Sequence, residues 1–117
     1  MSMLESFVTL VSGATDAGER IYPQVAPDGV ARPFIVYQRI NTNTENVLSG
    51  STGLKNTRLQ VDVFATTYVQ AQQIATAIEN LMGSWSTPNV SVVSQDFYED
   101  EVKLHRVMTD FSIWHDT

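Results

Sequence analysis

The chain has 117 residues, of which 43% are hydrophobic, and it contains no cysteine. This length predicts a single domain over residues 1–117, and the hydrophobic content is ordinary for a globular protein. The lack of cysteine excludes disulfides, thiolate catalysis and cysteine-based zinc sites. The net charge is −6 and the seven basic residues are scattered, which argues against tight nucleic-acid binding by a lone subunit. No apolar run approaches the roughly 20 residues of a membrane-spanning helix, so no membrane partner is expected.

The N-terminal third predicts a short helix, a connector and a strand. Ser2 and Glu5 form a candidate capping box, and apolar residues at helical spacing follow as far as Val11, with an end near Gly13. Residues Arg20–Arg32 hold two prolines and a Pro-Asp-Gly turn signal, which is typical of an ordered connector. Residues Pro33–Ile40 then read as a strand with two partly apolar faces, as in a strand that is covered on both sides.

The stretch Arg58–Tyr68, RLQVDVFATTY, predicts a strand that runs directly into a helix. Its apolar residues alternate with polar ones, which is the period of a half-buried strand. Thr67 can N-cap a helix over Tyr68–Met82, with Gln70 completing a capping box and Gly83 after the last turn. The segment between the two strands, Asn41–Asn56, is polar and rich in Thr, Asn, Ser and Gly, so we expect a long loop there.

The last third predicts two more strands. Asn89–Tyr98 is the first, and its run of valines is compatible with a bulge. An acidic turn follows, and Leu104–Trp114 is the second, with one face formed by Val107, Phe111 and Ile113. The element order α-β-β-α-β-β predicts an α+β fold, in which a four-stranded mixed sheet carries two helices packed on one face.

The sequence offers no catalytic or metal site. The two histidines, His105 and His115, lie on one strand about 33 Å apart if it is fully extended, so they cannot share a ligand. No hydrolase or metalloprotease motif is present. The acidic residues around Glu99 do not have the spacing of a calcium-binding loop and read as a solvated turn. We therefore expect a protein that is not an enzyme and that uses no cofactor.

Several features favour a subunit interface instead. Arg–Asp pairs can form across the non-core faces of two strands, either as an ordinary polar face or as an oligomer contact or pore lining. Aromatic residues share faces with these charges, and Glu79 is the only formal charge between Thr66 and Gln95. Interfaces are rich in aromatic residues and poor in Lys and Glu. The candidate interface residues are Tyr37, Leu48, Leu54, Arg58, Asp62, Phe64, Arg106, Asp110 and Trp114.

Five segments carry a family resemblance. They are RIYP (Arg20–Pro23), PFIVYQRI (Pro33–Ile40), RLQVDVFATTY (Arg58–Tyr68), the pair His105–Arg106 and DFSIWH (Asp110–His115). In this order and at this spacing they resemble the small tail-completion proteins of long-tailed bacteriophages, which are head–tail joining and tail-terminator proteins. The first helix and the polar segment Asn41–Asn56 do not contribute.

The resemblance implies a structural role without catalytic residues. Such proteins form a ring, commonly a hexamer, at the head-proximal end of the tail tube, where they stop tube polymerisation and join the tail to the head. The implied partners are further copies of the chain, the major tail tube protein and the head connector protein, with DNA only as passing cargo. The implied location is the virion, after assembly in the host cytoplasm. Two alternatives remain: a head-side connector or stopper subunit, and a small dimeric ferredoxin-like ligand-binding domain.

Overall fold

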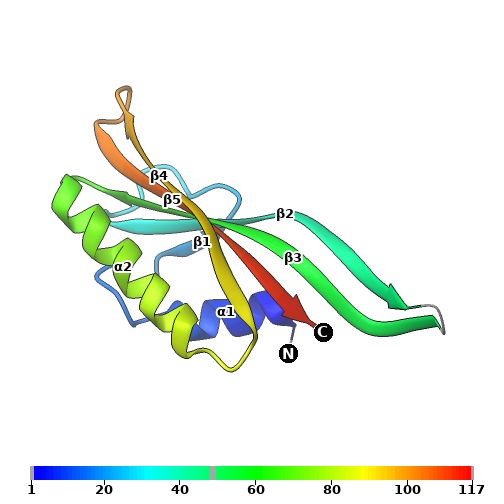
Figure 1. Cartoon of the computed structure of the whole chain (residues 1–117). Coiled ribbons are helices and arrows are strands. Elements are labelled where there is room, and N and C mark those ends of the chain that lie inside the picture. Colours follow the sequence, from blue (N-terminus) through cyan, green and yellow to red (C-terminus); the bar gives the residue numbers. More distant parts are fainter. Residues whose placement is uncertain (1, 48–49, 117) are drawn as a thin grey trace.

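The fold comes from a computed structural model that describes residues 2–47 and 50–116, with side chains described outside residues 45–52. Two helices and five strands follow one another along the chain (Figure 1). In chain order they are α1 (Met3–Val11), β1 (Ile21–Pro23), β2 (Phe34–Val47), β3 (Gly50–Ala65), α2 (Tyr68–Ser84), β4 (Asn89–Glu99) and β5 (Leu104–His115).

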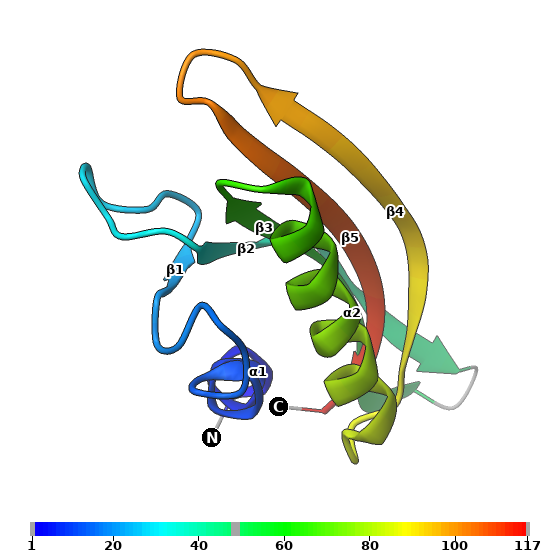
Figure 2. The same ribbon diagram turned by 90° about the vertical axis from the view of Figure 1, so that its left-hand side faces the viewer.

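The strands form one mixed sheet in the order β1-β2-β3-β5-β4. The β1–β2 pair is parallel and the other pairs are antiparallel. Both helices lie on the same side of the sheet (Figure 2). The predicted α+β class and mixed sheet are therefore confirmed. The predicted strand number was wrong, because Ile21–Pro23, inside the expected connector, pairs with Ile35–Tyr37 as a fifth strand.

The expected loop over Asn41–Asn56 was also wrong. β2 continues to Val47 and β3 begins at Gly50, and the two strands pair there, for example at Thr42–Thr57 and Thr44–Lys55. We call the outer part of this hairpin, 41–47 and 50–54, the arm. It projects beyond the remaining sheet and contributes to a molecular length of 52 Å (Figure 1). A ribbon that lies away from the core needs no apolar alternation, so the usual strand pattern is absent from its sequence.

Side-chain caps fix the starts of both helices. The Ser2 amide donates to Glu5 Oε1 at 3.0 Å and the Glu5 amide donates to Ser2 Oγ at 3.2 Å, so the predicted capping box is confirmed. The hydrogen bond that the Glu5 carboxyl accepts from the Ser2 amide, and after it the interaction with the Ser2 side chain, lower the pKa of Glu5. Thr67 caps α2 by accepting from the Gln70 amide at 3.2 Å. The helix ends later than predicted, since Gly83 lies inside it and Trp85 is the C-cap.

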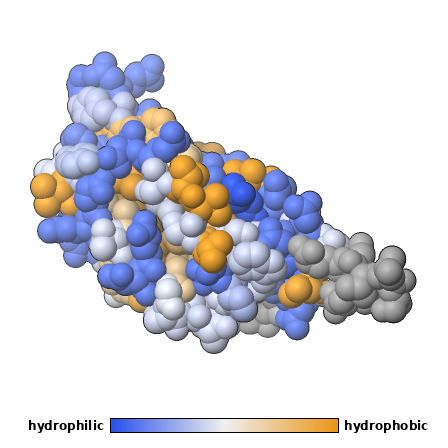
Figure 3. Space-filling view, viewed as in Figure 1, coloured by the Kyte–Doolittle hydropathy of each residue, from blue (hydrophilic) through white to orange (hydrophobic). Residues whose placement is uncertain are grey.

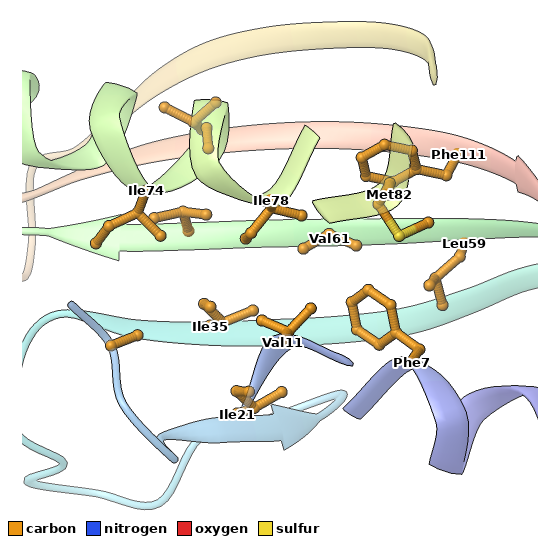
Figure 4. Close-up of a cluster of buried hydrophobic side chains, with 14 of the residues drawn as sticks. Phe7, Val11, Ile21, Ile35, Leu59, Val61, Ile74, Ile78, Met82 and Phe111 are labelled. Carbon is orange, nitrogen blue, oxygen red and sulfur yellow. The ribbon is translucent and has the colours of Figure 1, made fainter. Parts of the chain in front are cut away.

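The main core lies between the helices and one face of the sheet (Figure 4). Phe7 and Val11 of α1 and Ile74, Ile78 and Met82 of α2 meet the apolar face of the central strands. That face carries the predicted alternation, because the buried residues of β3 and β5 include Leu59, Val61, Val63, Val107, Phe111 and Ile113. A register shift between Ser91 and Val93 confirms the bulge in β4.

Phe111→Ala tests this core. Phe111 is fully buried between the sheet and the helices, so removing its ring should lower the free energy of unfolding by about 3–5 kcal/mol. Val69→Ala on the outside of α2, where the side chain is 62% exposed, is the matched control and should change it by less than about 0.5 kcal/mol. Urea unfolding followed by circular dichroism measures both. Equal losses in the two variants would contradict the placement of this core.

Candidate assembly interface

Charged residues on β3 and β5 meet across the sheet face that points away from the helices. Arg106 Nε lies 3.1 Å from Asp62 Oδ1, and Arg58 Nη1 lies 3.8 Å from Asp110 Oδ2. In the register, Phe64 pairs with Arg106 and Gln60 pairs with Asp110, so both ion pairs are diagonal neighbours. The predicted cross-strand Arg–Asp pairs are thus confirmed, and we call this surface the outer face.

The Arg106 guanidinium is the centre of a network that is satisfied within the subunit. Besides Asp62 it contacts Glu99 Oε1 at 3.0 Å, and Gln60 donates to the second Asp62 oxygen at 2.9 Å. Burial by itself would lower the pKa of Arg106, but the hydrogen bonds to the two carboxylates outweigh it and raise that pKa. The Asp62 side chain is only 8% exposed. These charges therefore hold β3, β4 and β5 together and offer little to a partner.

The connector between β1 and β2 covers one end of the outer face. A second apolar cluster forms there from Phe34, Val36 and Leu104, with residues of the connector packed against it. Phe64 belongs to this cluster, and its ring stacks on Phe34 with centroids 4.9 Å apart. The connector sequence gave no signal for this role, because its few apolar residues have no regular period.

The remaining sequence-derived candidates lie in other places. Tyr37 is on the helix side of β2, where its ring meets Phe7 edge to face at 5.6 Å. Leu54 and Trp114 line a cleft of about 340 Å³ near the base of the arm, together with Met3 of α1. Leu48 lies outside the described residues. The eight candidates that the structure describes do not form one surface, and the part of all nine in an interface stays a prediction.

A further set of exposed apolar side chains was not among the sequence-derived candidates. The set lies on both sides of the edge strand β4 and on the outside of the first turn of α2. Figure 3 shows apolar side chains gathered in the middle of the face that β4 crosses in Figure 1. The side chains are 40–62% exposed. The charge-poor helix had already indicated an interface, and the strand is likewise without charge from Asn89 to Gln95. We call it the β4–α2 surface; it comprises Tyr68, Val69, Val90, Val92, Val93, Phe97 and Tyr98.

Polar contacts hold the two parts of the β4–α2 surface in place. The Tyr68 hydroxyl donates to Asp96 Oδ2 at 2.7 Å, and Gln72 donates to Asp96 Oδ1 at 2.8 Å. The hydrogen bond to Asp96 raises the pKa of Tyr68. The His105 ring lies near both Tyr68 and Tyr98, with centroids 5.9 and 4.9 Å away. The exposed apolar side chains therefore stand on a surface that is already ordered in the single subunit.

The described part of the chain shows no site for metal chemistry. No group of three or more His, Asp or Glu residues in 2–47 and 50–116 could hold an ion. The His115 ring contacts the Thr57 hydroxyl at 2.7 Å, and Thr57 is buried under the arm base. Among the helices of these residues, none combines the length and apolarity that crossing a membrane requires.

Residues 3–116 match the family described as tail completion protein gp17. The chain belongs to this family. The resemblance drawn from the five sequence segments is confirmed by a match that spans almost the whole chain, α1 and the arm included. A role as a tail completion protein of bacteriophages follows from this membership, and it is a structural role.

Comparison with solved structures supports the fold. A chain in the structure titled "Virion of native gene transfer agent (GTA) particle" superposes with a TM-score of 0.65 at 14% sequence identity. The alignment covers 92% of this chain and 82% of that chain. No curated protein matches the chain in sequence. At this identity the likeness establishes the shared architecture alone.

Arg106→Met tests the internal role of the charge network. The substitution strands the buried Asp62 carboxylate without its cation, so the free energy of unfolding should fall by roughly 3 kcal/mol, the low end for a broken buried ion pair. Arg58→Met is the matched control, since the Arg58–Asp110 pair is longer and more exposed and should be worth about 0–1 kcal/mol. Chemical denaturation at neutral pH measures both losses. Adding Asp62→Asn to Arg106→Met should recover part of the stability, and a further loss would contradict the argument.

Proposed function

We propose that this protein forms a closed ring at the head-proximal end of the phage tail tube, where it ends tube polymerisation and joins the tail to the head connector. Family membership supports a tail-completion role. The observation that carries the ring is the presence of two unlike and unmatched surfaces on one subunit: the projecting arm and the exposed β4–α2 surface.

Two unlike surfaces suit a head-to-tail assembly. A contact between different patches on successive copies generates a ring when the rotation closes, whereas a self-complementary patch stops at a dimer. An isolated two-stranded hairpin is only marginally stable in water, so the arm is expected to gain from a neighbouring subunit. Six copies are our expectation for the ring, from the resemblance to tail-terminator proteins.

The charge of the chain suits a conduit for DNA. Each copy carries a net charge of −6, so a ring has a strongly acidic total charge and would not grip the phosphate backbone as DNA passes. The same repulsion opposes closure, and salt should therefore favour assembly by screening it. The tail tube protein and the head connector protein are the proposed partners on the two sides of the ring, in a virion that assembles in the host cytoplasm.

The alternative function is that of a head-side connector or stopper subunit. The likeness to a chain of a whole gene transfer agent particle is compatible with a place on the tail side or on the head side. Separate pulldowns with assembled tail tubes and with the portal complex divide the two. Binding to tubes alone supports the tail-side proposal. Binding to the portal alone overturns it in favour of the head-side role.

Ring formation is tested directly with purified protein and tail tubes. Negative-stain images should show a ring capping one end of each tube, and mass photometry of the concentrated protein should show one discrete oligomer. The yield of oligomer should rise between low salt and about 0.5 M salt, because screening removes subunit repulsion. A protein that stays monomeric at all salt concentrations and leaves tube ends bare would refute the proposal.

Trp114→Ala and Phe64→Ala separate assembly from folding. Trp114 lines an open cleft at the arm base, so its removal should reduce tube capping several-fold while the melting temperature changes little. Phe64 stacks on Phe34 inside the second apolar cluster, so its removal should lower the melting temperature clearly. Differential scanning fluorimetry and counts of capped tubes report the two effects. A large fall in melting temperature for Trp114→Ala, with normal capping by the folded fraction, would assign that side chain to the core.

A further inference from the structure

β4 is a long sheet edge with little protection. Every residue of β4 except its two ends, Asn89 and Glu99, is exposed. Proteins usually guard such edges with charged residues, prolines, bulges or a short strand. The stretch Asn89–Gln95 has no charge and no proline, and its bulge between Ser91 and Val93 is the only such device there. An uncharged, valine-rich edge of this kind is a template for a further strand.

The arm is a two-stranded hairpin that extends beyond its neighbouring strands. β1 pairs with β2 only as far as Tyr37, and β5 pairs with β3 only from Lys55 onwards. From Gln38 to Thr44, the outer edge of β2 has no strand partner among the described residues. The arm residues Asn41, Asn43 and Thr44 of this strand are exposed as well. The β2 edge of the arm therefore presents backbone donors and acceptors that a sheet edge could satisfy.

We propose that the arm of one subunit pairs along the free edge of β4 in the next copy, so that the sheets of neighbouring subunits join across the ring. This inference rests on the proposed ring and names the contact that closes it. One contact of this type serves both exposed elements at once. A β4–β4 pairing between two copies would leave both arms without support and would stop at a dimer. Addition of a strand to an exposed edge is a common mode of recognition, with the backbone supplying the affinity.

Charge complementarity supports this pairing over other occupants of the β4 edge. Arg39 and Lys55 at the base of the arm form no ion pair with any described residue. At the other surface, Asp96 accepts only from the neutral donors Tyr68 and Gln72, and Glu101 in the following turn has no cationic partner among the described residues. The base of the arm thus offers cations, and the end of β4 and the turn after it offer carboxylates without a cationic partner, which favours the correct partner and its orientation.

The absence of cysteine makes cross-linking a clean test. One cysteine goes into the arm as Asn43→Cys or Thr44→Cys, whose side chains alternate between the two faces of the ribbon. A second goes into β4 as Ser91→Cys or Gln95→Cys, and all four combinations are made in one chain. All four wild-type side chains are exposed, so the variants should fold normally. The control joins Thr44→Cys with Asp28→Cys, an exposed position in the connector.

The variants are assembled on tail tubes, oxidised mildly and run on a non-reducing gel. At least one arm–β4 combination should convert most of the chain into a ladder that ends at the ring size, while each single variant and the connector control remain monomeric. Capped tubes without a ladder in any combination would overturn the arm–β4 contact and leave the proposed ring standing. Covalent dimers of Ser91→Cys alone, or a ladder in the connector control, would also overturn it. Bare tubes and no ladder would overturn the ring as well.

Discussion

The structure depends on the pairing of β3 with strands on both sides. β3 pairs with β2 on one edge and with β5 on the other, and its buried residues Leu59, Val61 and Val63 receive the side chains of both helices. Because side chains alternate along a strand, a slip of one residue would move this whole set to the outer face. The hydrophobic gain from one buried face therefore sets the register of three strands, and the arm, the ion pairs and the sheet edges take their places from it.

The unequal lengths of the strands explain the shape of the subunit. β3 runs past the last residue that β5 can pair with, so the excess of the β2–β3 hairpin leaves the body as the arm. At the other side, α2 lies over the central strands, and its polar contacts to β4 are limited to Asp96 and the Asn89 side chain, which donates to the Met82 carbonyl. β4 is thus held at its edge without being covered. The same arrangement that makes a compact core leaves β4 exposed along its edge and lets the arm project beyond the body.

The parts of the fold that could be predicted are those in which one residue type has one clear physical role. Ser2 and Thr67 predict helix starts because only a few side chains can accept a hydrogen bond from a free backbone amide in the first turn of a helix. The alternation of apolar and polar residues over Leu59–Val63 predicts a strand because every second side chain of a half-buried strand is buried. The cross-strand pairs of Arg58 and Arg106 followed from the same period.

The parts that could not be predicted are stabilised by backbone pairing or by distant contacts. β1 has three residues, too few for a period, and it exists because Ile35–Tyr37 offers it an edge. The arm is polar because it lies outside the core, and its Asn and Gly residues look like a loop to any method that depends on hydrophobic pattern. Phe64 looked exposed by its position in the strand, but residues far away in the connector complete a second apolar cluster around it.

The edges of the sheet suit a contact between subunits better than its outer face does. The outer face looked available because it carries charges and aromatic rings, yet its central carboxylate is buried, its arginine is shared by two acids, and Phe64 and Phe97 lie within 6 Å of that guanidinium. A partner would have to break this network before gaining anything from it, which costs more than an exposed pair returns. Pairing at an open strand edge does not require any ion pair to break. The backbone groups of the edge exchange hydrogen bonds to water for hydrogen bonds to a neighbouring strand, and the subunit stays intact. The proposed assembly through edges would therefore let each subunit fold alone and keep its own ion pairs when it joins the next.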